Sequence, residues 1–155
     1  MPEPPPATSL DKALQSLPHG PAFRFLDRIT SLEPGVSVTA SYSVRGDEAF
    51  LEGHFPGSPL LPGVILVEAL AQAAGIAAQT GLTPPLQNLR LTAIRSAKIL
   101  GSAVPGETLE IKAHITGRLG GLIQAEGEIH RTGTMERLLG AQIVLAGTEP
   151  ATVDP

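Results

Sequence analysis

The chain has 155 residues, 42% of them apolar and 17% charged, so it is long and apolar enough to fold as one globular domain rather than remain disordered. Its net charge of -4, with no long basic run, argues against a nucleic-acid groove. Because it contains no cysteine, disulfides, thiolate metal sites and cysteine nucleophiles are excluded.

Both ends of the chain are rich in proline and small residues. Residues 1–9 and 148–155 are therefore predicted to be flexible tails around a single domain at residues 10–147. The first tail lacks the basic start and apolar run of a signal peptide, and Glu68 and Gln72 interrupt the longest apolar segment. We expect a soluble cytoplasmic protein that does not insert into a membrane.

The first predicted elements are a short helix and a hairpin. Apolar residues at helical spacing between positions 10 and 17 predict a helix that ends before "PHGP". Residues 22–33 are interpreted as a strand. After an "EPG" turn, the alternation of apolar residues over 36–44 predicts a second strand with one buried face.

A long apolar helix is predicted over residues 63–80, with Gly81 in the position that a left-handed helix cap requires. Four further segments then alternate as strands do, near 89–93, 109–115, 121–130 and 137–147. Two strands, one buried helix and four strands predict an α+β fold, in which a curved antiparallel sheet of about six strands wraps around one long central helix.

The polar side chains of this helix are unusual. Before Gln79 they are only Glu68 and Gln72, whose spacing of four places them on one face. Burying an unpaired charge is costly, so Glu68 must either face a cleft or subunit interface with partners or become neutral. A neutral carboxyl group is a proton donor, and His54 in the preceding Gly/Pro loop is the natural base to work with it.

The approach to the helix is rigid. Pro56, Pro59 and Pro62 restrict the backbone, and Gly63 opens the first turn with bare N–H groups. Such a helix start attracts negative charge, for example the enolate oxygen that forms from a thioester carbonyl.

The segment "GHFPGSPLLPGVILVEALAQAAG", residues 53–75, resembles the (3R)-hydroxyacyl-[acyl-carrier-protein] dehydratases of bacterial fatty-acid synthesis, of the FabZ type. The matching positions are His54, Phe55, Pro56, Gly57, Pro59, Pro62, Gly63, Val64, Glu68, Ala69, Ala71 and Gln72. A weaker resemblance extends from "LPH" at 17–19 and "LDRI" at 26–29 to "VPGETL" at 104–109. It implies a hot-dog fold and removal of water from a 3-hydroxyacyl thioester, with no metal and no organic cofactor.

The resemblance also implies a homodimer with two shared active sites, often assembled as a trimer of dimers. His54 of one subunit would remove the proton at C2 of the substrate. Glu68 of the partner, with Gln72 nearby, would protonate the departing C3 hydroxyl.

The same resemblance suggests residues that bind the substrate. Gly63 and Val64 at the helix start would hold the thioester carbonyl, and the acyl chain would run along an apolar tunnel beside the helix. Phe50 and Phe55 would line that tunnel.

The carrier of the acyl group stays open between an acyl carrier protein and coenzyme A. Arg90, Arg95 and Lys98 would form a small basic patch for an acidic carrier protein. However, "AKILGSAVPG" has apolar or small residues where the family has an aromatic residue and basic residues. A specialised carrier protein or coenzyme A thioesters are therefore alternatives to housekeeping fatty-acid synthesis.

Two other functions fit the same scaffold. Glu68 could activate water in a thioesterase, or the chain could be a non-catalytic subunit that holds acyl chains. The presence of both His54 and Glu68 favours dehydration. His19, His114 and His130 have no partner at motif spacing, so structural or surface roles are expected for them, and no His-Glu-x-x-His zinc signature occurs.

Overall fold

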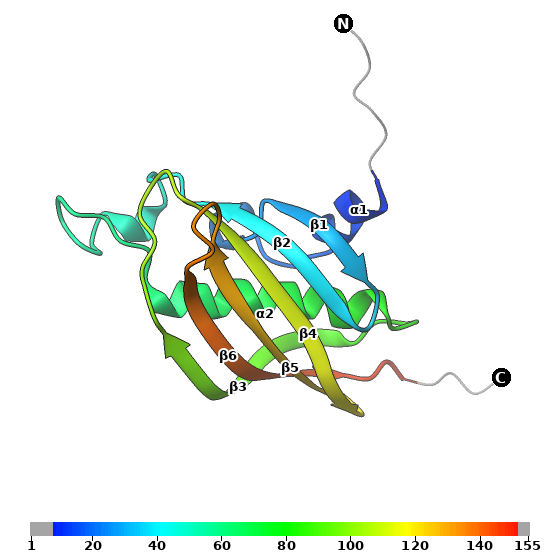
Figure 1. The fold of residues 1–155 in the computed structure, drawn as a ribbon. Coiled ribbons are helices and arrows are strands. Elements are labelled where there is room, and N and C mark those ends of the chain that lie inside the picture. The colour runs from blue at the N-terminus through cyan, green and yellow to red at the C-terminus, as the bar shows by residue number, and fades with distance from the viewer. Residues whose placement is uncertain (1–7, 152–155) are drawn as a thin grey trace, which may run out of the picture.

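A computed structural model describes residues 8–151 as a six-stranded antiparallel sheet curved around one long helix (Figure 1), which confirms the predicted fold class. The strand order is β1-β2-β4-β5-β6-β3, so β1 and β3 form the two edges. The helices and strands in chain order are α1 (Ser9–Gln15), β1 (Arg28–Glu33), β2 (Ser37–Ser43), α2 (Gly63–Thr80), β3 (Gln87–Ile99), β4 (Thr108–Leu119), β5 (Leu122–Arg131) and β6 (Arg137–Thr148).

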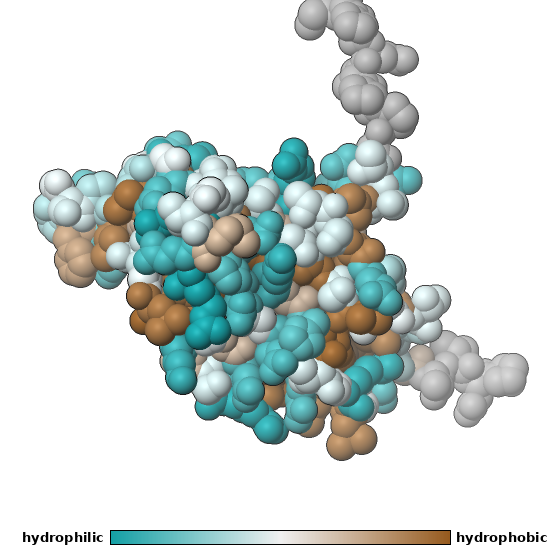
Figure 2. Space-filling model, viewed as in Figure 1, coloured by the Kyte–Doolittle hydropathy of each residue, from teal (hydrophilic) through white to brown (hydrophobic). Residues whose placement is uncertain are grey.

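Along the central strands of the sheet, successive side chains alternate between a buried face and a solvent-exposed face. In β4, Ile111 is buried between Ala40 of β2 and Ile129 of β5, which are its partners on the two neighbouring strands. The alternate residues Lys112 and His114 are exposed. Hydrophilic residues accordingly cover much of the face in front of α2, and hydrophobic residues appear mainly at its margins (Figure 2). The period-two pattern therefore predicted the central strands correctly, whereas β3 is exposed along most of its length and extends to Ile99.

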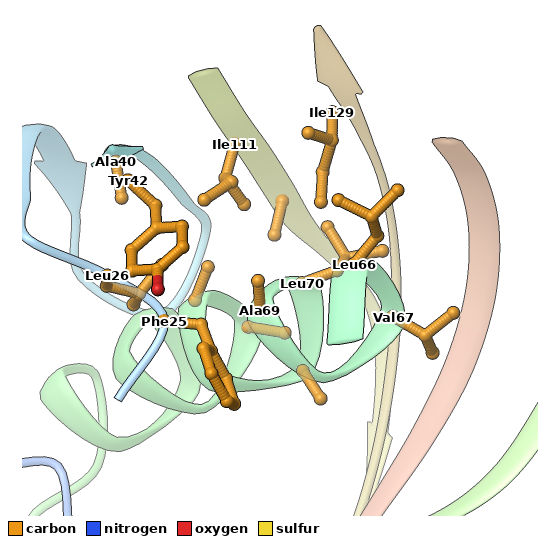
Figure 3. Packing of buried hydrophobic residues seen from close by; sticks show 14 of the residues in the cluster. Phe25, Leu26, Ala40, Tyr42, Leu66, Val67, Ala69, Leu70, Ile111 and Ile129 are labelled. Carbon is orange, nitrogen blue, oxygen red and sulfur yellow. The ribbon is translucent and has the colours of Figure 1, made fainter. Parts of the chain in front are cut away.

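Helix α2 fills the inside of the curve. Leu66 and Leu70 are fully buried and point toward Ile111 and Ile129 of the sheet (Figure 3). The helix can lie this close because Gly127 has no side chain: a Cβ there would be 2.6 Å from Leu70 Cδ1. Although α2 is long and apolar enough to cross a membrane, 61% of it is buried inside the fold, and this packing accounts for its composition.

The strand predicted over residues 22–33 was wrong in its first half, because β1 begins only at Arg28. Pro21–Phe23 forms a 3-10 helix instead. Two residues after this helix, Phe25 N–H donates to the side chain of Gln72 in α2 rather than to a neighbouring strand. A buried side chain of the helix therefore replaces a strand partner here.

The expected left-handed cap at Gly81 was also wrong, because Gly81 has a φ of -91°. Its lack of a side chain serves close packing instead. A Cβ on Gly81 would lie 2.4 Å from Cα of Gly35 in the β1–β2 turn. The same turn is tied to the helix by Gly35 N–H, which donates to Ala77 O over 2.7 Å.

The structured part of the chain extends slightly beyond the expected domain of 10–147. Thr8 caps α1 by accepting from Asp11 N–H over 3.2 Å, and Thr148 is the last residue of β6. The remainder of the N-terminal tail and the last four residues of the C-terminal tail lie outside the described residues.

Candidate active site

A cavity of about 900 Å³ lies between α2, β3 and the residues that follow α1. Glu68 and Gln72 contribute polar groups from the first half of α2, and His19 joins them from the α1 side. The rest of the wall is mixed, with Gln79, Thr80, Asn88 and Arg90 beside hydrophobic side chains. Its hydrophobic members are Leu17, Ile76, Leu86, Leu89, Leu91 and Leu145. The cavity thus combines an acid with a surface suited to an aliphatic group.

Gln72 fixes the orientation of Glu68. Its side chain is 2% exposed, and its Oε1 accepts from Phe25 N–H over 3.0 Å. Because a backbone N–H can only donate, the amide nitrogen of Gln72 must face Phe23 O at 2.9 Å and Glu68 Oε1 at 3.1 Å. The predicted stacking of Glu68 and Gln72 is therefore present. Oε1 of Glu68 is already an acceptor, which leaves Oε2 as the oxygen that would carry an acidic proton.

His19 is a member of the site that the sequence analysis missed. Its Nε2 lies 3.3 Å from Glu68 Oε1, and the two side chains are 30% and 21% exposed. Arg24 holds this segment in place, because its Nε donates to the carbonyl of His19 over 2.8 Å. The sequence analysis expected a structural or surface role for His19, and the structure places it in contact with Glu68. The match of "LPH" to the family pattern was the signal that could have identified it.

His54 occupies a loop that projects from the body of the molecule (Figure 1), here called the His54 loop, residues 52–60. Its Nδ1 is 2.8 Å from Leu60 O, and Leu60 N–H donates back to His54 O over 2.7 Å. A carbonyl oxygen only accepts, so Nδ1 carries the hydrogen and the lone pair of the neutral ring is on Nε2. Phe55 stacks on the imidazole at 4.2 Å between ring centres. The loop therefore presents a base at Nε2.

Within one chain this base does not reach the acid. The residues that line the cavity include none from the His54 loop. Across residues 8–151, no hydrogen bond or ion pair links His54 to Glu68. A single subunit therefore presents the two groups at separate places.

A buried carboxylate anchors the segment that leads into the His54 loop. Glu48 accepts hydrogen bonds from Tyr42 Oη at 2.8 Å, Arg45 N at 2.9 Å and Gly46 N at 2.8 Å. Burial by itself would raise the pKa of Glu48, but the N–H of Arg45 and the hydroxyl of Tyr42 outweigh it and lower that pKa. Burial, and then the bond to Glu48, raises the pKa of Tyr42. No pattern in the sequence indicated this cluster.

The remaining predicted residues are spread around α2. Gly63 is the first residue of α2, and a Cβ there would come within 2.7 Å of Ile99 Cδ1 at the end of β3. No side chain caps this first turn, and Val64 is 72% exposed. Phe50 packs edge-on against Phe25, with ring centres 5.9 Å apart, and does not line the cavity.

The three predicted basic residues lie on the edge strand β3. Arg90 lines the cavity, and Arg95 and Lys98 are exposed further along the strand. Within the described range, β3 pairs with β6 alone, so its other edge has no strand neighbour.

The fold and the arrangement around Glu68 define a hot-dog protein with an acid above an apolar cavity, and comparisons with known proteins agree. Residues 17–135 match the family model of the FabA-like domain. A 3-hydroxyacyl-[acyl-carrier-protein] dehydratase FabZ from Anaeromyxobacter sp. (strain Fw109-5) is 36% identical over 126 residues, which cover 79% of this chain and 80% of the relative. The FabZ of Ruminiclostridium cellulolyticum is 40% identical, covering 73% of this chain and 88% of the relative.

A solved structure shows the same fold at lower identity. "The Dehydratase Heterocomplex ApeI:P from Xenorhabdus doucetiae" superposes with a TM-score of 0.74 at 18% identity, over 92% of this chain and 93% of that one. The structural match shows the fold, and the sequence matches show the family. This chain belongs to the FabA-like family, among the FabZ-type dehydratases.

Proposed function

We propose that this protein removes water from a (3R)-3-hydroxyacyl thioester and releases the trans-2-enoyl thioester, in fatty-acid synthesis or a related acyl-chain pathway. Its relatives named FabZ dehydratases support this reaction. The observation that carries it is Glu68, which Gln72 holds by Oε1 at the edge of an apolar cavity while Oε2 is left for a proton. A proton donor beside a channel for an aliphatic chain suits elimination of a hydroxyl group.

The complete site is proposed to form between two copies of the chain. One copy supplies the cavity and Glu68, and the other supplies His54 from its projecting loop. The separation of these groups within one chain supports this arrangement. The open edge of β3 and the exposed Val64 and Phe55 give the second copy a surface to bury. A homodimer is the smallest active unit, and a trimer of dimers would contain three such pairs.

The proposed reaction uses the atoms that the hydrogen bonds of His54 and Glu68 leave available, His54 Nε2 to accept a proton and Glu68 Oε2 to donate one. His54 Nε2 takes the proton from C2, the electrons of that C–H bond form the C2–C3 double bond, and the C3–O bond breaks. Glu68 of the other subunit gives its Oε2 proton to the leaving hydroxyl, which departs as water. The imidazolium and the carboxylate return to their starting states by proton exchange through water, so no external reagent is consumed. His19 is proposed to act as a positioning residue through its contact with Glu68 Oε1.

The substrate contacts are proposed from position. The uncapped N–H groups at Gly63 and Val64 would polarise the thioester carbonyl. Phe55, which stacks on His54, would border the acyl group, whereas Phe50 would support it only through the core contact with Phe25.

The carrier is proposed to be an acyl carrier protein in the cytoplasm. Arg90 at the cavity wall and the exposed Arg95 and Lys98 provide positive charge along one strand.

Turnover of 3-hydroxyacyl thioesters on acyl carrier protein and on coenzyme A tests the proposal. Formation of a conjugated enoyl thioester, followed by absorbance, is the expected result. Release of free thiol without the enoyl product would instead assign the protein to the thioesterases. Acyl binding that is unaffected by His54→Ala, together with no turnover on any thioester, would assign it to non-catalytic acyl-binding subunits.

A further inference from the structure

We propose that Arg24 is a positioning residue of the active site, which acts on the acid Glu68 through His19. The proposal rests on the proposed function, because it takes Glu68 as the acid of the reaction. Nε of Arg24 donates to the carbonyl of His19 over 2.8 Å, and Nη2 donates to the carbonyl of Leu17 over 3.1 Å. His19 Nε2 in turn lies 3.3 Å from Glu68 Oε1. These contacts connect Arg24 to the acid by way of the segment that carries His19.

Helix α2 fixes the backbone on both sides of Arg24. Phe23 O accepts from Gln72 Nε2 over 2.9 Å, and Phe25 N–H donates to Gln72 Oε1 over 3.0 Å. Phe25 is also buried in the core. The side chain of Arg24 therefore starts from a point that the helix holds, and it reaches back from there to residues 17–19.

The segment at residues 17–19 depends on Arg24 for its position. Leu17 N–H donates to Leu14 O over 3.2 Å, but within residues 8–151 the backbone of Pro18 and His19 has no hydrogen bond other than the one from Arg24. The contact of His19 with the carboxyl group has little margin, because a distance of about 3.6 Å between donor and acceptor no longer makes a hydrogen bond. A small shift of the segment would therefore break it.

The guanidinium group of Arg24 suits this task. It is planar and carries five N–H donors, so it can bond the carbonyls of Leu17 and His19 at the same time. The ammonium group of a lysine is a single compact charge without this fork. Across the described residues Arg24 takes part in no ion pair, so its donors serve backbone carbonyls rather than a carboxylate.

Together these bonds close a ring around the acid. One arm runs from Gln72 directly to Glu68 Oε1. The other arm runs from Gln72 through Phe23 and Arg24 to His19, and it ends on the same oxygen. Loss of the Arg24 side chain would free the His19 arm and leave the Gln72 arm in place. Turnover should then fall without being abolished.

A double-mutant cycle between Arg24 and His19 tests the proposal with a 3-hydroxybutanoyl thioester. Arg24→Met removes the donors and is expected to lower kcat about fivefold, with a smaller change in KM. In the His19→Ala background the same substitution should change kcat by less than about twofold, because the residue through which it acts is gone. Arg24→Lys, which can bond one carbonyl, should lie between the wild type and Arg24→Met.

Arg118→Met is the matched control. Arg118 also donates from Nε to a backbone carbonyl, that of Gly120, over 3.3 Å, and it does not line the cavity. Its kcat should equal that of the wild type. Denaturant unfolding is measured for every variant, and Arg24→Lys replaces Arg24→Met in the cycle if the methionine variant does not fold. An equal loss of kcat in both His19 backgrounds, or lower stability with unchanged kcat, would overturn the proposal.

Heteronuclear NMR of labelled histidine rings tests the same contact without turnover. Glu68→Gln should shift the Nε2 resonance of His19 when Arg24 is present and should leave it in place in Arg24→Met. The same shift in both backgrounds would show that Arg24 does not hold His19 against the acid. A wild type that turns over no thioester would contradict the proposed function, whereas the NMR comparison would still decide the role of Arg24.

Discussion

Gln72 donates a hydrogen bond to Glu68 Oε1 over 3.1 Å, and the direction of that bond is set by the backbone of a distant segment. Phe25 N–H and Phe23 O bond to the two ends of the Gln72 amide, so the amide has one orientation only. The segment before β1 therefore fixes the Gln72 amide, and this amide in turn orients the carboxyl group of Glu68. Oε2 of Glu68 remains for proton transfer.

Replacing Gln72 with methionine is expected to reduce both stability and turnover. The change keeps the length of the side chain but leaves Phe25 N–H and Phe23 O without their partner. The cost is about 1–3 kcal/mol for the buried Phe25 N–H, and it is smaller for the part-buried Phe23 O. The free energy of unfolding from denaturant titration and kcat for a butanoyl substrate measure the two effects.

Gln79→Met is the matched control for Gln72→Met. Like Gln72, the Gln79 amide both donates to the backbone and accepts from it, here through the C=O and the N–H of Leu86. The two variants should lose similar stability. The role of Gln72 in presenting Glu68 would be refuted if kcat for butanoyl fell no further in Gln72→Met than in Gln79→Met.

His19→Ala should lower kcat more than it changes KM, because the side chain of His19 contacts Glu68. The side chain is 30% exposed, so unfolding should change by no more than about 0.5 kcal/mol. His19→Gln keeps a side-chain N–H and should recover part of the lost kcat. If glutamine recovers nothing, or if KM rather than kcat changes, the contact with Glu68 does not position the acid.

The hydrogen bonds of Glu48 with Tyr42, Arg45 and Gly46 should make the free energy of unfolding depend on pH in the acid range. The pKa of Glu48 is lower in the folded chain than in the unfolded chain, where it is about 4.3. The stabilisation that the Glu48 carboxylate gives to the fold is therefore complete above the unfolded pKa, and it is lost as pH falls through the folded pKa. Glu48→Gln should therefore be less stable than the wild type at neutral pH, and the gap should narrow below about pH 4. Thermal melts from neutral pH into this range measure it. A gap that stays constant with pH would show that the carboxylate charge is not what stabilises the loop.

The sequence predicted the parts of the fold that depend on local pattern. Alternation identified the strands, and the apolar run between Gly63 and Thr80 identified the helix, because buried faces impose these periods on the residues themselves. The boundary of β1 could not be predicted, since it depends on Gln72, a residue far along the chain that takes the N–H of Phe25. His19 was missed for the same reason. Its partner Glu68 becomes a neighbour only after the segment following α1 packs against α2.

Glu68 and Gln72 lie on the predicted helix and His54 lies in the loop before it, and the predicted pairing of His54 with Glu68 of a second copy stays a prediction. One chain holds the acid in the cavity and the base on the His54 loop. Whether a second copy completes the site depends on a surface that a single sequence does not describe. Assembly is therefore the step on which the proposed mechanism depends.

Two variants, Glu68→Gln and His54→Ala, test whether two copies assemble the site. Glutamine keeps the shape of Glu68 but supplies no acidic proton, and alanine removes the base. Each variant alone is expected to form a folded dimer, by circular dichroism and light scattering, and to lose nearly all turnover. Retained turnover in Glu68→Gln would remove this residue from the mechanism.

Co-expression of these two inactive variants tests the shared site most directly. Random pairing makes half of the dimers mixed, and each mixed dimer holds one site with an intact His54 and an intact Glu68, so about a quarter of the wild-type activity should return. Mixed dimers are verified by native mass spectrometry with differently tagged subunits. Activity that stays at the level of the separate variants, in a sample shown to contain mixed dimers, would contradict a site built from two chains.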